Sequence, residues 1–204
     1  MHSTPLEDHS MAKSNSHFED GRAVMVVKTV IYSDIKVRNR PSFYATPVAW
    51  AAANFAQMLI GDEGGIVPHQ TGMIVVSDEC SLSTIRELSR TAAQGTISPL
   101  RFAGASPSIV AGLPALEQGI RGPTLCLTMP PRHASSALVA IINYWMRYSN
   151  IVSVIAIAHY QLDERRHLFK GLIARSAGDE LREQVLQLTD SQTGEMCDSL
   201  CQND

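Results

Sequence analysis

The residues best placed for chemistry in this 204-residue chain are His133, Ser135 and Ser136. They follow a short apolar stretch and a Pro-Pro turn, and they open a segment, 133–149, with helical spacing of its apolar residues. Many α/β enzymes hold a nucleophile at such a strand–turn–helix junction, where a hydroxyl beside an imidazole acts as nucleophile and base. Serine and histidine at a helix start more often serve as caps or surface turn residues. Catalysis at this turn is therefore the weaker of two interpretations.

The cysteines offer little further chemistry. Cys80 and Cys126 lie beside or within apolar segments, and we expect both to be reduced, buried small hydrophobes. A reactive thiolate needs a helix N-terminus or a cationic neighbour, and Cys126 has neither nearby in sequence. Cys197 and Cys201 form a C-x3-C pair in a polar tail without a second pair of ligands, so we interpret them as incidental.

No cofactor is expected. The sequence has no Gly-rich phosphate loop and no G-x-G-x-x-G pattern after a strand, which argues against a nucleotide cofactor. The seven histidines occur singly, without ligand spacing, which argues against a metal. His159 ends an apolar segment and could face a cleft, but no partner carboxylate can be identified from the sequence.

Composition limits the class of protein. Hydrophobic residues make up 45% of the chain and charged residues only 18%, against about 25% in typical soluble proteins. Two explanations stay open: an α/β core buried on both faces, or a large subunit interface. A net charge of −3 without a basic stripe gives no reason to expect nucleic acid, and no apolar run approaches the ~18 residues that span a bilayer. Together with a polar N-terminus, 1–22, these features predict a cytoplasmic protein with a disordered lead-in.

The elements that must position these residues alternate. Val- and Ile-rich stretches predict strands at 23–33, 72–78, 124–129 and 151–160. Helices are predicted at 48–61, 81–95 and 133–149, and another after a loop from residue 96, beginning near Ser106 and Pro107. The part from 161 onward is charged and is predicted to be helical. The pattern indicates an α/β fold with a mostly parallel mixed sheet and helices on its faces. We expect one domain over 23–175 and a helical, fraying tail over 176–204.

One block is similar to a known family. The block 97–141, which contains the stretch SPLRFAGASPSIVAGLPALEQGIRGPTLCLT (98–128), resembles the centre of the N-terminal half of β-ketoacyl synthases, the condensing enzymes of the thiolase-like fold. The resemblance covers roughly 23–160, with specific motifs only in the central block, and it implies half of a thiolase-like fold. The matching residues are Ser98, Pro99, Phe102, Ala111, Gly112, Gly119, Gly122, Pro123, Ala140 and Ile141.

The departures from the family bear on activity. Aligning the helix places Ala134 at the position of the family's nucleophilic cysteine, and counting from the Gly-Pro pair places Pro131 there instead. The turn is also longer than the family's elbow, and the sequence stops where the second half, with two catalytic histidines, would begin. The resemblance therefore implies a subunit without the family's condensing activity.

The resemblance then suggests a role and its residues. Chain-length factors of type II polyketide and aryl-polyene systems are nucleophile-lacking relatives that pair with an active β-ketoacyl synthase as a heterodimer, and this chain looks like a short one. Acyl carrier protein is a possible further partner. For the acyl tunnel the resemblance implies Phe102, Ser106, Ser108 and Ile109. For the partner interface it implies Thr124, Cys126, Thr128 and Met129.

Two other functions stay open. One is a stand-alone thiolase-like acyltransferase or hydrolase acting on carrier-protein thioesters through Ser135 or Ser136 with His133. The other is a homodimeric module that recognises acyl carrier protein without processing its cargo.

Overall fold

The computed structural model describes residues 24–26, 35, 37–41, 43–63, 65–163 and 166–190. These residues form one five-stranded sheet of order β1-β5-β4-β2-β3. Its strands are β1 (Val24–Val26), β2 (Thr71–Val76), β3 (Thr124–Leu127), β4 (Ser153–Gln161) and β5 (His167–Ala174). The helices are α1 (Pro47–Glu63), α2 (Leu82–Ala93), α3 (Pro99–Ala103), α4 (Ile109–Glu117), α5 (Ser135–Tyr148) and α6 (Asp179–Thr189). Single 3-10 turns precede β2 (Pro68–Gln70) and α5 (Pro131–His133).

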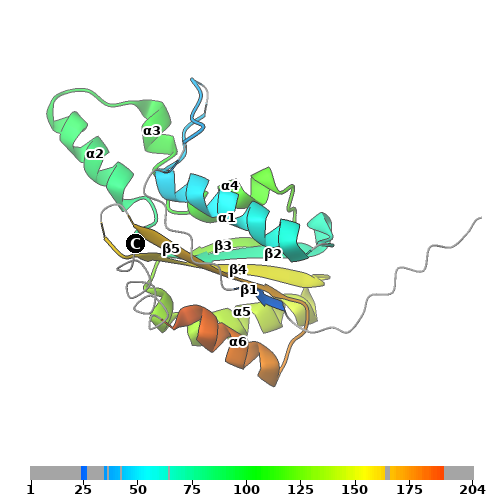
Figure 1. Ribbon diagram of the computed structural model, residues 1–204. Helices are drawn as coiled ribbons and strands as arrows, with labels where there is room; N and C mark the ends of the chain where they lie inside the picture. Colours follow the sequence, from blue (N-terminus) through cyan, green and yellow to red (C-terminus); the bar gives the residue numbers. More distant parts are fainter. Residues whose placement is uncertain are drawn as a thin grey trace, which may run out of the picture.

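The body has three layers, with α1 and α4 on one face of the sheet and α5 and α6 on the other (Figure 1). Strand β2 pairs in parallel with β3 and β4, whereas β5 pairs antiparallel with both β4 and β1. Four of the five strands therefore run in one direction. The predicted α/β fold, with a mixed sheet and helices on both faces, is confirmed.

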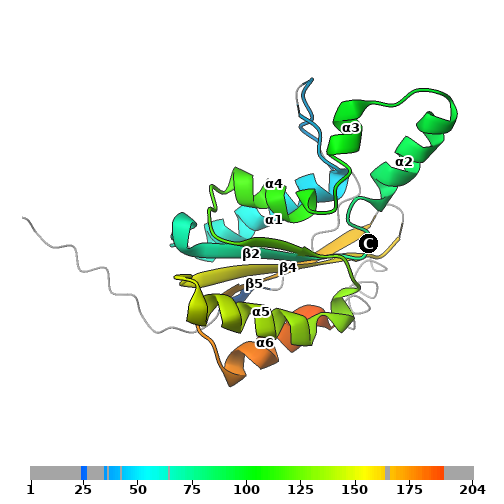
Figure 2. The same ribbon diagram turned by 180° about the vertical axis from the view of Figure 1, so that it is seen from behind.

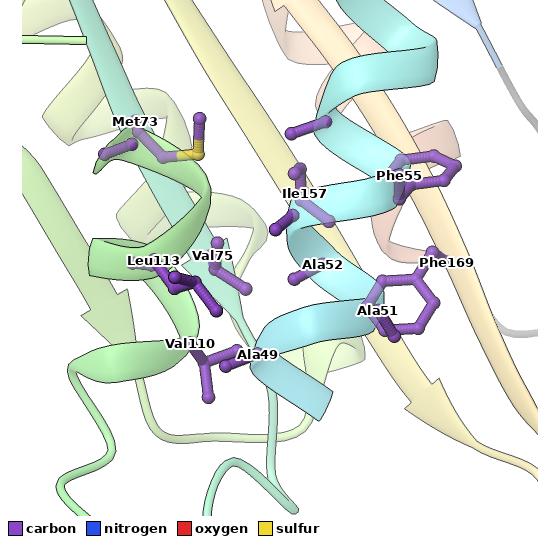
Figure 3. Packing of buried hydrophobic residues seen from close by; sticks show 14 of the residues in the cluster. Ala49, Ala51, Ala52, Phe55, Met73, Val75, Val110, Leu113, Ile157 and Phe169 are labelled. Carbon is purple, nitrogen blue, oxygen red and sulfur yellow. The ribbon is translucent and has the colours of Figure 1, made fainter. Parts of the chain in front are cut away.

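The first core lies between the sheet and helices α1 and α4 (Figure 3). Helix α1 contributes a run of buried alanines to this core, and their short side chains let the helix approach its neighbours closely. Gly171 in β5 shows how close the approach is, because a Cβ atom there would meet Phe55 and Leu59 of α1 at 2.7 and 2.6 Å. Phe55 also packs against Phe169 of β5, with 5.8 Å between ring centroids.

The second core lies between the sheet and helices α5 and α6. Side chains of β2 alternate between the two cores, since Val75 belongs to the first and Val76 to the second. All six residues of β2 are buried, as expected for an interior strand covered on both faces. Helix α6 contributes Leu181, Val185 and Leu188 to this core, so it is packed against the body.

The helix predicted from residue 161 onward is wrong in its first half. There the Asp163 carboxylate accepts a hydrogen bond from the Arg166 backbone N–H at 2.8 Å. The following stretch, 167–174, is a fully buried strand paired with β4. Lys170 and Gly171 interrupt its apolar character in the sequence, which hid the strand signal. Helix α6 begins only at Asp179.

The loop predicted from residue 96 contains a short helix, α3. Ser98 caps it, because its Oγ accepts a hydrogen bond from the Arg101 backbone N–H at 3.4 Å, and Pro99 occupies its first turn. The next helix, α4, follows Ser108 rather than Ser106. Helices α2 and α3 lie beyond the end of the three-layered body in both views (Figure 1 and Figure 2).

Three of the predictions made from the sequence concern residues that the structure does not describe. The lead-in 1–22, most of the strand predicted at 23–33 beyond β1, and the tail thiols Cys197 and Cys201 lie outside the described residues. Within the described ranges, no helix is both long enough and apolar enough to cross a bilayer.

Candidate functional site

The carboxyl ends of three parallel strands bring the candidate residues to one end of the sheet. Ser77 follows β2, Thr128 follows β3, and His159 lies near the end of β4. The Ser77 backbone N–H donates to the Leu127 carbonyl oxygen at 3.0 Å, which ties the first two ends together. Open α/β sheets bind ligands outside the carboxyl ends of their strands, so a ligand site is expected at this end of the sheet.

The turn after β3 carries no nucleophile at either position suggested by the resemblance. Ala134 stands directly before α5, is 0% exposed and packs with Leu138 and Ile142 in the second core. Pro131 begins the 3-10 turn and is also buried. A buried methyl group and a buried pyrrolidine ring cannot attack a thioester.

His133, Ser135 and Ser136 are neighbours in sequence but do not form a hydrogen-bonded pair of base and hydroxyl. The exposed His133 accepts a hydrogen bond at Nε2 from Arg132 Nε, 3.3 Å away. Within the part of the chain that the structure describes, no hydrogen bond joins His133 to either serine. Both serines instead line a hollow of about 260 Å³ between α5 and α6, together with Arg182 and Leu186.

A buried polar chain runs from Ser77 through His159 to His167. Ser77 Oγ lies 2.8 Å from His159 Nδ1, and His159 Nε2 lies 3.0 Å from His167 Nδ1. Because Ser77 Oγ already accepts the Cys80 backbone N–H at 2.9 Å, its proton is free for His159 Nδ1. His159 Nε2–H then donates to His167, which links β2, β4 and β5.

Both imidazoles in this chain favour the neutral state. Burial, together with the neighbouring His167, lowers the pKa of His159 to about 3. Burial also lowers the pKa of His167, against the opposing negative charges of Glu79 and Asp163. A hydroxyl donating to a neutral imidazole is the arrangement of a nucleophile and its base. Ser77 and His159 are both 0% exposed, however, so the arrangement serves to satisfy polar groups at the strand ends.

The sequence pointed to His159 but missed its partners. Ser77 is 82 residues away, and His167 lies on a strand that was predicted to be helical. The available signal was a polar residue at or near the end of each of two buried strands, Ser77 after β2 and His159 near the end of β4. It becomes useful only when the two strands are known to be neighbours in the sheet.

Two thiols adjoin this chain. Cys80 follows the turn after β2 and Cys126 lies in β3, and their sulfur atoms are 3.7 Å apart. The Cys80 thiol also donates to the Ser77 carbonyl oxygen at 3.1 Å. Cys80 is buried and Cys126 is half-buried, and both are free thiols beside the first core. The sequence predicted that both cysteines are buried, whereas Cys126 is only half-buried, and it did not predict that the two sulfur atoms lie close together.

An apolar pocket of about 630 Å³ lies between α2 and α3. Phe102 and Ser106, two of the four residues proposed for an acyl tunnel, line it, and Phe102 is 72% exposed. Ser108 is exposed and lies 2.8 Å from Ser106 between hydroxyl oxygens, whereas Ile109 packs against the first core. The remaining lining residues are Ile85, Leu88, Ser89, Ala92, Ile97, Ala103 and Ala105.

The four residues proposed for a partner interface lie on and just after the edge strand. Thr124 and Thr128 are exposed, and Cys126 is half-buried with its side chain toward the first core. Met129 packs instead against the second core. Among the described strands β3 pairs only with β2, so its other edge presents unpaired backbone groups.

The comparisons with known proteins bear on the fold. No family model matches the chain, and no curated protein matches it. Among solved structures, it matches a ketosynthase (ApeO) in complex with its chain length factor (ApeC) from Xenorhabdus doucetiae, with a TM-score of 0.52 and 12% identity over 66% of this chain and 59% of that chain. It also matches the ishigamide ketosynthase/chain length factor, with a TM-score of 0.55 and 13% identity over 70% of this chain and 48% of that chain.

The chain thus spans about half to three-fifths of the length of each of these two structures. At this low sequence identity the similarity shows a shared backbone fold alone. That fold is the one implied by the resemblance of the 97–141 block to β-ketoacyl synthases. The chain therefore has a thiolase-like, ketosynthase-type fold of the kind found in ketosynthase and chain-length-factor complexes.

Proposed function

We propose that this chain is a catalytically inactive, chain-length-factor-type subunit, which pairs with an active β-ketoacyl synthase and helps to shape the pocket for a growing acyl chain. The observation that carries the proposal is the buried Ala134 directly before α5, at the position where the resemblance to β-ketoacyl synthases implies a nucleophilic cysteine. The two solved structures described above are of ketosynthases with chain length factors.

The edge strand supports the proposed partnership. Strand β3 presents an unpaired backbone edge beside the exposed Thr124 and Thr128. Proteins rarely leave such an edge open, because unpaired N–H and C=O groups invite pairing with another chain. A partner strand placed along β3 would satisfy these groups, and we assign Thr124, Cys126, Thr128 and Met129 to that contact.

The pocket between α2 and α3 supports the proposed role in chain length. Its volume of about 630 Å³ lies within the range of small-molecule sites, and its lining is almost wholly apolar. A hydrocarbon chain fits such a lining, because burial of each CH₂ group contributes about 0.8 kcal/mol. We assign Phe102 and Ser106 to the acyl chain directly, and Ser108 and Ile109 to the support of this wall. Acyl carrier protein would deliver the chain to the complex.

The test compares products with and without this chain. A β-ketoacyl synthase from the same genome is incubated with acylated carrier protein and extender units, alone and with the purified chain, and products are resolved by mass spectrometry. The proposal predicts products of defined length only in the presence of the chain, without an acyl mass shift on the chain itself. An acyl adduct that disappears in Ser135→Ala or Ser136→Ala would establish a catalytic role instead and contradict the proposal.

A further inference from the structure

We propose that Cys80 and Cys126 form a redox modification site, at which peroxide converts the two thiols into a disulfide joining the loop after β2 to the edge strand β3. The proposal rests on the geometry of the two side chains and is independent of the proposed function. Cys126 lies on the strand assigned above to the partner contact, but its side chain packs against the first core, beside Cys80.

The geometry brings the sulfurs almost into bonding range. They lie 3.7 Å apart, whereas a disulfide requires about 2.05 Å, so the side chains must rotate or the loop must shift for the bond to form. Cys126 stands opposite Val75 in the β2–β3 register, and Cys80 returns toward this pair at the end of the Ser77 turn. The residues are 46 positions apart, so their contact is made by the fold rather than by the local chain.

The conformation of Cys80 is also unusual. Among the described residues other than glycine, it alone has a positive φ, at 43°. Side chains make this left-handed conformation costly, so it persists only where surrounding contacts hold it. The Cys80 backbone N–H is held by Ser77 Oγ at 2.9 Å, and Ser77 is held in turn by His159 at 2.8 Å. The buried polar chain therefore fixes the turn that carries the Cys80 thiol.

The two thiols divide the chemical roles. The hydrogen bond from Cys126 lowers the pKa of Cys80, against burial and the negative charges of Asp78 and Glu79. The same hydrogen bond, together with burial, raises the pKa of Cys126. Cys80 also stands two residues before α2, and a helix N-terminus favours an anion, so we assign the attack on peroxide to Cys80 and the second step to Cys126.

The reaction balances in two steps. The Cys80 thiolate attacks one oxygen of hydrogen peroxide, breaks the O–O bond and becomes a sulfenic acid, while the hydroxide that leaves takes a proton to become water. Cys126 sulfur then attacks Cys80 sulfur, the S–O bond breaks, and the departing hydroxide takes the Cys126 proton. Overall, two thiols and one hydrogen peroxide give one disulfide and two waters. A dithiol reductant reverses the change by thiol–disulfide exchange.

The disulfide would close a loop of the chain that contains every residue lining the apolar pocket. Helices α2, α3 and α4 lie between the two cysteines in sequence, and the pocket lies between the first two of these helices. Closing the loop fixes the base of α2 to the sheet edge. We expect slower hydrogen exchange in α2 and α3 when the chain is oxidised.

The experiment uses the full chain with Cys197 and Cys201 both replaced by serine, so that only the proposed pair remains. The reduced protein is treated with equimolar hydrogen peroxide, alkylated under denaturing conditions, digested and examined by mass spectrometry. The expected result is a peptide pair linked between Cys80 and Cys126, lighter by two hydrogens and released by dithiothreitol. Dimedone should label Cys80 in the Cys126→Ser variant, whereas the Cys80→Ser variant should show no link and little dimedone labelling of Cys126.

Three outcomes would overturn the inference: both thiols alkylated after peroxide treatment, sulfinic acid at Cys80 without a link, or dimedone labelling of Cys126 before Cys80. If a serine variant fails to fold, as judged by circular dichroism, the linked peptide in the two-cysteine protein still decides whether the disulfide forms. The reduced and oxidised forms are then compared by hydrogen exchange, with α6 as an internal reference outside the closed loop.

Discussion

Gly122 lies so close to Thr71 that a Cβ atom at residue 122 would overlap the Thr71 carbonyl oxygen. This contact is made where the chain enters β3, and the next residue, Pro123, accepts a hydrogen bond at its carbonyl oxygen from the Met73 backbone N–H at 2.9 Å. The Gly-Pro pair that resembles the ketosynthase motif thus has a packing reason: only glycine lets the start of β3 pass this close to β2.

The first prediction follows from this contact. Gly122→Ala should lower the free energy of unfolding by about 1–3 kcal/mol, because the backbone of β2 or β3 must move to admit the methyl group. The control is Gly112→Ala in α4, where a Cβ atom meets nothing within 4 Å. That variant should be unchanged or more stable by about 0.5–1 kcal/mol, since alanine favours helix. Urea denaturation measures both, and equal stability of the two variants would contradict the packing argument.

Acid should destabilise the fold through the buried histidines. The pKa of His159 is lowered to about 3 in the folded chain, so the unfolded chain takes up a proton first as the pH falls below about 6.5. The contribution of the neutral His159 to the free energy of unfolding is therefore fully present above about pH 6.5. It is lost as the pH falls toward 3, by up to about 1.4 kcal/mol per pH unit. His167, whose pKa is also lowered by burial, adds to the loss.

The measurement is urea denaturation from neutral pH down to about 4.5, in wild type and His159→Gln. The variant should lose part of the pH dependence, whatever its absolute stability at neutral pH. His133→Gln, which replaces an exposed histidine on the same end of the sheet, serves as the control and should keep the wild-type slope. A His159→Gln slope identical to wild type would show that this imidazole is not the buried neutral group described above.

Filling the apolar pocket should weaken binding of hydrocarbon chains. Ala92 lines the pocket from α2, and Ala92→Trp would occupy much of its volume of about 630 Å³. We expect at least tenfold weaker binding of a fluorescent fatty acid, equivalent to about 1.4 kcal/mol. Arg90→Trp places the same side chain on α2 at an exposed residue that does not line the pocket, and it should bind like wild type. Equal weakening by both variants would place the binding site elsewhere.

A charge at the end of the edge strand should break the proposed heterodimer. Thr128 is exposed in the chain alone, so Thr128→Arg should leave its thermal stability nearly unchanged. Within an interface an unpaired guanidinium costs several kcal/mol, so co-purification with the ketosynthase should be lost. Gln57→Arg on the exposed side of α1 is the control and should still co-purify.

Met129→Arg should break the same complex, but it carries less information alone, because Met129 also packs in the second core. A complex that survives Thr128→Arg would mean that the interface lies elsewhere.

The helices and strands that were predicted correctly from the sequence are those with an uninterrupted run of apolar or strongly helix-forming residues. Strand β2 and the alanine-rich helix α1 stand within two residues of their predicted bounds, because an uninterrupted apolar run and a high helix propensity need no tertiary information. Strand β5 was missed because Lys170 looks like a surface residue, although it is buried and its Nζ donates to the Asp190 carbonyl oxygen. Helix α3 was missed because five residues are too few for helical periodicity to appear.

The candidate site residues likewise include some that the sequence predicted and some that it missed. Phe102 and Ser106 were predicted to border an acyl tunnel and do line the apolar pocket, although the binding of a chain there stays a prediction. The links between Ser77 and His159 and between Cys80 and Cys126 join residues 82 and 46 positions apart. Such pairs depend on strand order and register, which a single sequence does not reveal.

The measurement that most directly tests the account is native mass spectrometry of the full chain, purified alone and after co-expression with a β-ketoacyl synthase from the same genome. The account predicts a one-to-one complex that persists through purification and is absent for Thr128→Arg. A monomer or homodimer of this chain that leaves the ketosynthase unbound would contradict it.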